Sequence, residues 1–334
     1  MSKKKLKKTY IIAETACSHD GSPGRLKKLI RAANNAKADA IQFQVWQGED
    51  IVTPKHKDFK FLKSIELSRR EWKECFNYTK KKFPRLEIIA CISDIDTLKF
   101  CDKLGANAFK LHTSDLGNKD LLREASKLKK RIDLSVGGST EKEIKQALNY
   151  IKKRCEVWLM YGYQLFPTKP GSLNILKMKS LIKKFRLEVG YQDHSPPNIS
   201  GFTIPILAIG SGIKVIEKHL TDDRKRKGTD SEAALEPDEF KLFVNKCNEA
   251  FLTMRNLNLS KLSKEEIKYR KYSKKKVFFS KNLTKGNIIS GTDLLIRRPV
   301  KKNGLLVDDI NKVLGKKIRK NVKKYQLVEK KLFI

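Results

Sequence analysis

Two histidines in the second half of the chain follow short strand-like segments. His194 ends the segment Val189–His194, and His219 ends the segment Val215–His219. Asp230 comes after a loop rich in Lys and Arg. Two imidazoles delivered by neighbouring strands, with a carboxylate nearby, are a ligand set for a divalent metal with open coordination positions. A single histidine at a strand end is more often a hydrogen-bonded structural residue, so the metal hypothesis depends on what the other strands deliver.

Eight β-prone segments alternate with longer amphipathic segments. The expected strands are Tyr10–Ala13, Ala40–Phe43, Glu87–Ala90, Ala108–Leu111, Ile132–Ser135, Glu156–Met160, Leu187–Gly190 and Lys214–Glu217. The expected helices include Gly24–Lys37, Arg69–Lys82, Ile95–Leu104, Asp120–Lys129 and Glu141–Lys153, with Ser139–Glu141 supplying an N-cap. Eight such repeats predict a (β/α)8 barrel, also called a TIM barrel. The alternative is a doubly wound sheet, but residues 14–21 lack the GxGxxG turn that it would need after the first strand.

The pattern changes after residue 257, which indicates a second domain. We expect the barrel domain over residues 1–257, closed by a helix at Pro237–Leu257 with Pro in the favoured first turn. Residues 258–276 are highly charged and predict a linker or an extended helix. Residues 277–280, 282–286, 288–291 and 294–299 are expected to be short strands separated by Gly turns, so residues 277–334 predict a small, mostly β domain.

Composition limits the class of protein. The chain has 334 residues, 40% of them hydrophobic, and no run approaches the apolar length of a transmembrane span. The Lys-rich residues 2–8 lack the apolar stretch of a signal peptide. The six cysteines show no CxxC spacing, which predicts reduced thiols. We therefore expect a cytoplasmic protein.

The formal net charge of +36 raises the question of nucleic-acid binding. The basic residues are mostly Lys and are spread along the whole chain, with no basic stripe interleaved with aromatic residues. This distribution argues against a specific nucleic-acid site. Part of the excess is suited to attracting an anionic substrate.

In a (β/α)8 barrel the chemistry lies where the strands end. The residues expected there are Glu14, His19, Gln42, Gln44, Cys91, Asp94, Lys110, His112, Thr113, Asp115, Ser135, Tyr161, Gln164, Asp193, His194, Glu217 and His219. Lys110 can pair with a phosphate or carboxylate, and the Thr113 and Ser135 hydroxyls can donate to phosphate oxygens. Glu14 and Asp115 can exchange protons if they are desolvated. From the residues alone, this set predicts metal-assisted carbon–carbon or phosphate chemistry.

Several motifs occur in the order of one known family. They are residues 11–14 (IIAE), 18–21 (SHDG), 38–44 (ADAIQFQ), 134–137 (LSVG), 166–168 (FPT), 190–194 (GYQDH), 216–219 (IEKH) and 235–240 (LEPDEF). Together they resemble the sialic acid synthase family. The segment from Leu283 through Arg297-Arg-Pro299 to Gly315 resembles the antifreeze-like, or SAF, domain that follows the barrel in those enzymes.

The resemblance implies condensation of phosphoenolpyruvate with an open-chain N-acetylated aminosugar similar to N-acetylmannosamine, giving a nine-carbon 2-keto acid and phosphate. It implies Mn²⁺ or Mg²⁺ as cofactor and a domain-swapped homodimer as the assembly. By position, the implied metal ligands are His194 and His219, the implied catalytic residues are Glu14 and Asp115, and the implied substrate-binding residues are Gln44, Lys110, Thr113, Ser135, Gln164, Asp230 and Arg298. Arg298 matches the arginine that the SAF domain contributes to the partner's site.

The chain departs from the family pattern at four places. Gln42 replaces the usual Lys of the KFQ motif, Gln192 replaces the usual Ser before Asp-His, Phe166 replaces the usual Tyr, and the stretch containing Cys91 lacks a usual hydroxyl. Losing a lysine that contacts an anion costs about 1.5–3 kcal/mol of charged hydrogen bonding.

Two alternatives remain open. One is a related barrel synthase or aldolase with a different donor or acceptor. The other is a barrel that binds sugar or phosphate with little turnover. Lys110, Ser135 and Arg298 favour an active synthase, whereas Gln42 and Gln192 favour these alternatives.

Overall fold

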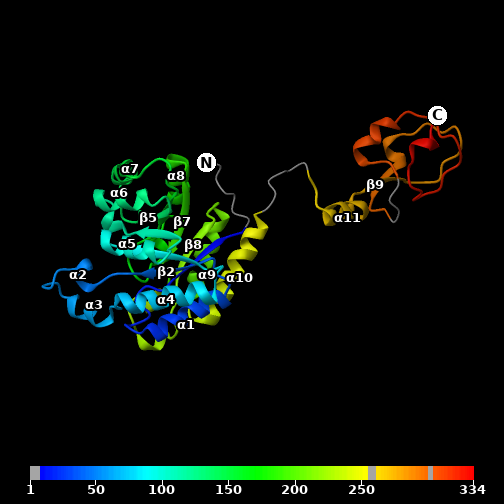
Figure 1. Cartoon of the computed structure of the whole chain (residues 1–334). Helices are drawn as coiled ribbons and strands as arrows, with labels where there is room; N and C mark the ends of the chain where they lie inside the picture. The colour runs from blue at the N-terminus through cyan, green and yellow to red at the C-terminus, as the bar shows by residue number, and fades with distance from the viewer. Residues whose placement is uncertain (1–7, 255–260, 300–303) are drawn as a thin grey trace. The chain divides into compact units, whose positions relative to one another are not determined.

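The computed structural model describes residues 8–254, 261–299 and 304–334 and divides the chain into two compact units (Figure 1). The first unit is Met1–Arg255 and the second is Asn256–Ile334. Each unit has its own buried apolar core.

The first unit is built on a closed barrel of eight parallel strands. Their bounds are β1 Tyr10–Glu14, β2 Ala40–Gln44, β3 Glu87–Ile92, β4 Ala108–Leu111, β5 Arg131–Ser135, β6 Val157–Tyr161, β7 Glu188–Asp193 and β8 Val215–His219. Each strand pairs with the next, and β8 closes the ring on β1, where His219 lies opposite Glu14. The predicted (β/α)8 fold is therefore confirmed.

Helices alternate with the strands and cover the outside of the barrel (Figure 1). They are α1 Pro23–Asn35, α2 Gly48–Ile51, α3 Phe59–Ile65, α4 Arg69–Lys82, α5 Ile95–Lys103, α6 Lys119–Lys127, α7 Glu141–Tyr150, α8 Ile175–Phe185, α9 Ile199–Gly210 and α10 Pro237–Thr253. The N-cap expected near residue 140 is present, because Thr140 and Glu143 form a reciprocal capping box. We did not predict α9, because its sequence ISGFTIPILAIG is apolar on all sides and gives no amphipathic period.

Strand parity decides which side chains reach the barrel interior. Successive residues of a strand point to opposite faces, so on β8 Val215 and Glu217 share a face while Ile216 joins the core between strands and helices. The apolar interior cluster consists of Tyr10, Ile12, Ala40, Ile89, Ala108, Trp158, Met160 and Val215. Gly190 leaves room for this cluster, since an added Cβ would lie 2.4 Å from Met160 Sδ. The next residues of the same parity form a polar layer at the carboxyl ends of the strands.

The second unit contains α11 Lys264–Ser273 and an antiparallel pair formed by β9 Lys276–Phe279 and β10 Leu294–Arg297. Residues 282–286 and 288–291, expected to be strands, instead make isolated bridges such as Leu283 with Val322 and Ile288 with Lys317. Glycine turns interrupt pairing before a regular ladder forms, as at Gly286 with its φ of +92°.

Two further expectations concern cysteines and membranes. All six cysteines are free thiols, as their spacing predicted. Within the described ranges, none of the helices is both long and apolar enough to cross a membrane.

Candidate active site

The polar layer at the carboxyl ends of the strands brings together most of the predicted site residues. Its buried members are Glu14, Gln42, Lys110, Ser135, Gln192, His194, Glu217 and His219. They come from β1, β2, β4, β5, β7 and β8 and the residue after β7. The closed ring of strands therefore brings together side chains that are up to 205 positions apart in sequence, as for Glu14 and His219.

A chain of hydrogen bonds crosses this layer. Lys110 Nζ donates to Glu217 Oε2 at 2.6 Å, and Gln192 Nε2 donates to Glu217 Oε1 at 3.1 Å. Ser135 Oγ donates to Gln192 Oε1 at 2.8 Å, and Thr113 Oγ1 lies 3.2 Å from Ser135 Oγ. Burial lowers the pKa of the Lys110 ammonium, but the adjacent Glu217 carboxylate outweighs burial and the net pKa is raised. Lys110 is therefore held as a cation in a dry site.

Glu14 lies beside this chain of hydrogen bonds, and one of its two carboxylate oxygens has a hydrogen-bond partner. Its Oε1 accepts a hydrogen bond from the Ala16 amide at 2.6 Å. Burial, followed by the neighbouring Glu217 charge, raises the pKa of Glu14 well above its usual range. A carboxyl group with a raised pKa can carry a proton near neutral pH, which is the property expected of an acid/base residue.

The two histidines lie side by side with nearly perpendicular rings. Their ring centroids are 5.2 Å apart, and the Phe166 ring lies 4.2 Å from that of His194. His194 Nδ1 is 2.8 Å from the Tyr163 carbonyl oxygen. Because a carbonyl only accepts, Nδ1 carries the proton and Nε2 keeps its lone pair. Burial lowers the pKa of both rings, and His194 further lowers that of His219, so both are neutral ligand-type imidazoles.

Asp230 approaches the pair from the loop after β8. Its Oδ2 lies 3.9 Å from His219 Nδ1. Burial, with the charge of Glu232, raises the pKa of Asp230 to about 6. The carboxylate is thus near the imidazoles without being hydrogen-bonded to them.

The two imidazoles fit a divalent ion as partial ligands. His219 Nδ1 is buried and has no hydrogen-bond partner among the described residues, and His194 offers the lone pair on Nε2. Within residues 8–254, 261–299 and 304–334, no group of three or more His, Cys, Asp or Glu side chains is arranged to hold a metal ion. The donor set therefore suits an ion whose remaining positions are filled by substrate oxygens and water.

The other predicted residues lie around this centre. Gln44 ends β2 and pairs in register with Cys91 of β3. Gln164 follows β6, and its Nε2 would lie 2.7 Å from a Cβ added at Gly137, so that glycine permits its approach. Asp115 closes the short turn after β4, and burial raises the pKa of its carboxyl group. Among the described residues, none of Gln44, Gln164 and Asp115 forms a hydrogen bond or ion pair with His194 or His219.

Buried polar atoms without partners gather at this same end of the barrel. Glu14 Oε2, Gln42 Oε1 and Gln164 Nε2 have no hydrogen-bond partner among the described residues, as His219 Nδ1 has none. Buried polar atoms in folded proteins are usually paired, and each exception needs an explanation. A polar ligand that fills the barrel mouth would pair several of these atoms at once.

Comparisons with known proteins decide the family. The NeuB family model matches residues 29–258, and the SAF domain model matches residues 276–333. The chain belongs to the NeuB family. This confirms the resemblance to sialic acid synthases with a C-terminal SAF domain.

Several relatives of this NeuB-family chain are named as nonulosonic acid synthases. The N,N'-diacetyllegionaminic acid synthase of Campylobacter jejuni is 30% identical and is matched over 97% of this chain and 99% of its own length. A pseudaminic acid synthase of Campylobacter jejuni is 29% identical over 95% of this chain and 94% of its own. The crystal structure of the N-acetylneuraminic acid synthetase of Leptospira borgpetersenii is 28% identical, with a TM-score of 0.72 over 79% of this chain and 91% of that one.

Arg298 lies in the SAF unit of this NeuB-family chain, directly after β10, and is exposed. The two units are separate compact bodies, so the described geometry places Arg298 within its own unit only. Its expected role at a partner's site stays a prediction.

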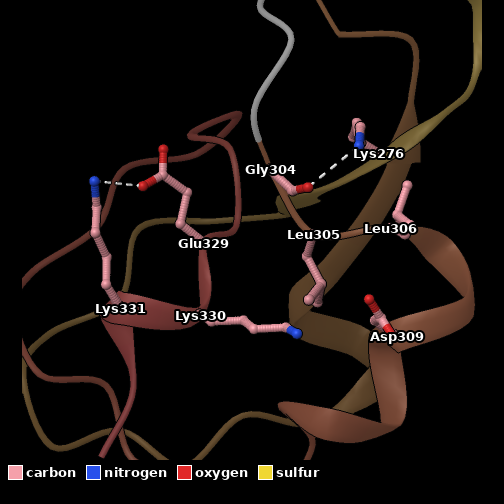
Figure 2. Close-up of a pocket in the computed structure, with 8 residues that line it drawn as sticks. All are labelled: Lys276, Gly304, Leu305, Leu306, Asp309, Glu329, Lys330 and Lys331. Atoms are coloured by element: carbon pink, nitrogen blue, oxygen red, sulfur yellow. Dashed lines mark hydrogen bonds and ion pairs between the residues drawn. The ribbon is translucent and has the colours of Figure 1, made fainter. Parts of the chain in front are cut away.

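A surface pocket in the SAF unit is less suited to chemistry than the barrel mouth (Figure 2). Lys276 Nζ on its rim donates to the Gly304 carbonyl at 3.3 Å. Lys331 Nζ pairs with Glu329 at 2.6 Å. Lys276 and Lys331 each have a partner, in contrast to the unpartnered atoms at the barrel mouth.

Sequence reasoning missed how Gln192 and Glu217 act and misplaced Asp193. Gln192 and Glu217 form the middle of the hydrogen-bond chain. Glu217 was expected at the strand ends without an assigned role, and Gln192 was noted only as a departure from the family pattern. Asp193, expected at the rim, points away from the interior to Lys218. We ended β7 at Gly190, whereas it runs to Asp193. The alternation from Gly190 to Gln192 to His194 was the signal that could have found the correct set.

Proposed function

We propose that this chain is a metal-assisted nonulosonate synthase that condenses phosphoenolpyruvate with an open-chain N-acetylated aminosugar to a nine-carbon 2-keto acid and phosphate. The observation that carries the proposal is the set of buried, unpartnered polar atoms at the barrel mouth, beside a buried lysine and a pair of neutral imidazoles. Membership of the NeuB family, together with relatives named as synthases of three nonulosonic acids, supports this choice of reaction.

The donor half of the site would be the hydrogen-bond chain. The Lys110 ammonium is the buried cation for the anionic groups of phosphoenolpyruvate, and the Ser135 and Thr113 hydroxyls lie along the same chain. Gln42 lies on the adjacent wall with its Oε1 unpartnered among the described residues. An amide at this position can orient the donor but adds no charge.

The acceptor half would be the side with His194 and His219. A divalent ion held by His194 and His219 would supply Lewis-acid chemistry that activates the sugar aldehyde. Gln44, Gln164 and Asp230 would line the sugar. Asp115 and Glu14 would handle protons, and Glu14 is favoured because burial and the neighbouring Glu217 raise its pKa well above its usual range.

The overall reaction balances with one water. The methylene carbon of phosphoenolpyruvate forms a bond to the aldehyde carbon of the sugar, whose oxygen gains a proton. Water adds to the resulting cationic carbon and gives up a proton. Phosphate then leaves with cleavage of the carbon–oxygen bond, which leaves the 2-keto acid.

The proposed boundaries are a catalytic domain at residues 1–257, a linker at 258–276 and a SAF domain at 277–334. We further propose a domain-swapped homodimer in the cytoplasm, in which the SAF domain of one chain brings Arg298 to the barrel of the other. This arrangement would give the donor a cation in addition to Lys110.

The test is phosphate release from phosphoenolpyruvate with a panel of N-acetylated hexosamines, in the presence of Mn²⁺ and after chelation. We expect release that depends on both the sugar and the metal. Release with a different aldehyde acceptor only would favour the alternative of a related synthase. No release with any acceptor, from protein that binds phosphoenolpyruvate, would leave the alternative of a binding barrel.

A further inference from the structure

Asp193 and Lys218 each directly precede one of the two histidines, yet their side chains lie outside the barrel interior. They are register partners on β7 and β8. Asp193 Oδ2 lies 2.9 Å from Lys218 Nζ, and both side chains are 0% exposed. Burying two charges has a desolvation cost that their attraction roughly offsets, so such a pair is weak as a source of stability. Its position beside both His194 and His219 points to another role.

The same two side chains fix the backbone on both sides of His194. Lys218 Nζ donates to the Ser195 carbonyl at 2.7 Å. Asp193 Oδ1 accepts from the Ser195 amide at 3.0 Å and from its hydroxyl at 2.5 Å. Tyr191 Oη also donates to Asp193 Oδ1, at 2.8 Å. The residues before and after His194 are therefore tied to β8.

The start of α9 closes over this cluster and keeps water out. An added Cβ at Gly201 would lie 2.5 Å from the Pro196 carbonyl oxygen and 3.7 Å from Lys218 Nζ. The helix backbone therefore approaches the ammonium closely. In such a dry setting, the distance between the two charges is held more firmly than at a surface.

We propose that Asp193 and Lys218 are positioning residues that set the separation and orientation of His194 and His219 for a divalent metal ion. This rests on the proposed metal role of the two histidines. Metal sites require ligands held to within about 0.5 Å, and groups behind the ligands commonly change metal affinity by roughly 10–100-fold. The ion pair directly links the ends of β7 and β8, which carry the two histidines. It can therefore fix the position of one histidine relative to the other.

The test is the affinity for Mn²⁺, measured by titration calorimetry on the full chain without substrates. The variant is D193N/K218M, which removes both charges and so leaves neither one buried alone. We expect the dissociation constant for Mn²⁺ to rise roughly 10–100-fold, with cooperative unfolding retained. A dissociation constant within twofold of that of the unaltered chain would overturn the inference.

The matched control is a second buried ion pair in the same barrel. Arg131 Nε lies 2.8 Å from Asp133 Oδ1, on β5. The variant R131M/D133N removes this pair in the same way, and we expect it to leave the Mn²⁺ affinity within twofold. Equal weakening in both double variants would mean general loosening of the barrel and would reject the positioning role.

Two further outcomes separate the possible failures. If D193N/K218M does not fold, Y191F removes only the hydroxyl that donates to Asp193, and we expect about threefold weaker Mn²⁺ binding. Unchanged affinity in folded Y191F then counts against the proposal. If the unaltered chain binds no Mn²⁺, the metal role itself fails, whereas binding that both variants leave unchanged rejects only the positioning role.

Discussion

Lys110 and Glu217 form an ion pair across the barrel, with Nζ and Oε2 2.6 Å apart and side-chain exposures of 1% and 3%. The lysine comes from β4 and the glutamate from β8, which lie on opposite sides of the ring. An anionic donor that binds at Lys110, as we propose, would have to compete with Glu217 for the ammonium. Before any such ligand binds, Glu217 keeps Lys110 charged and in place.

The variant E217Q should lower the free energy of unfolding by about 3–5 kcal/mol, because it leaves the Lys110 ammonium buried without a carboxylate. Urea denaturation at pH 7 measures the change. The double variant K110M/E217Q has no uncompensated charge and should recover most of the loss. If E217Q and the unaltered chain unfold at the same urea concentration, the buried pair is not formed in solution.

Replacing Gln42 by lysine should lower the KM for phosphoenolpyruvate by about 10–100-fold, since it restores a charged hydrogen bond to an anion. The new ammonium would lie beside Glu14, whose Oε2 has no partner within the described residues. Steady-state kinetics with saturating sugar give the KM. The control Q42M removes the amide without adding charge and should not lower the KM. An unchanged KM in folded Q42K would show that position 42 does not face the donor.

His194→Ala should reduce Mn²⁺-dependent phosphate release to below about a hundredth, because a metal ligand is removed. Its circular dichroism spectrum should not change. His56→Ala is the control, since the His56 side chain is 44% exposed and lies in the segment before α3. Retention of full activity by the H194A variant would remove His194 from the ligand set.

Mixing Arg298→Ala chains with His219→Ala chains should restore activity if Arg298 acts at a partner's site. Random pairing into dimers leaves one intact site in half of the dimers, so roughly a quarter of full activity is expected. Mixing with Arg297→Ala in place of Arg298→Ala tests the neighbouring arginine, which is also exposed. Absence of recovery, with mixed dimers demonstrated by mass spectrometry, would argue against the swap.

Acid should destabilise the protein partly through His19. Burial lowers the pKa of His19 to about 4, from an ordinary value of about 6.5 in the unfolded chain. The neutral form of His19 therefore stabilises the folded state fully above pH 6.5. This contribution is lost as the pH falls towards 4, and the total loss is about 3 kcal/mol below pH 4. H19Q should flatten the dependence of the unfolding free energy on pH between 6.5 and 4. Parallel curves for H19Q and the unaltered chain would contradict this assignment.

The alternation of segments was enough to predict the barrel, because strand and helix periods differ and eight repeats leave few other folds. The α9 helix was not predicted, for a physical reason. The α9 helix buries residues on several sides and has no polar face, so its sequence lacks the period that identifies a surface helix.

The site was predicted less completely than the fold. The positions of Glu14, Lys110 and Ser135 in the polar layer could be predicted, because these residues lie at strand ends. The partnership of Gln192 with Glu217 depends on which face of β7 and β8 each side chain occupies. Because we ended β7 at Gly190, three residues early, the alternation of side chains between the two faces of the strand was not followed to Gln192 and Asp193. Arg298 lies in the second unit, and the sequence pattern within that unit does not determine where the unit lies relative to a barrel.

The polar layer draws one or two side chains from each of six different strands of a continuous ring. A substitution in one strand can therefore change a single contact to a ligand while the hydrogen-bonded ladder on either side stays intact. Gln42 and Gln192 are two examples. Each departs from the family pattern at one inward-facing position, while the outward-facing residues of the same strand remain part of the core. Descendants of such a barrel can exchange one substrate for another stepwise, with each intermediate still folded.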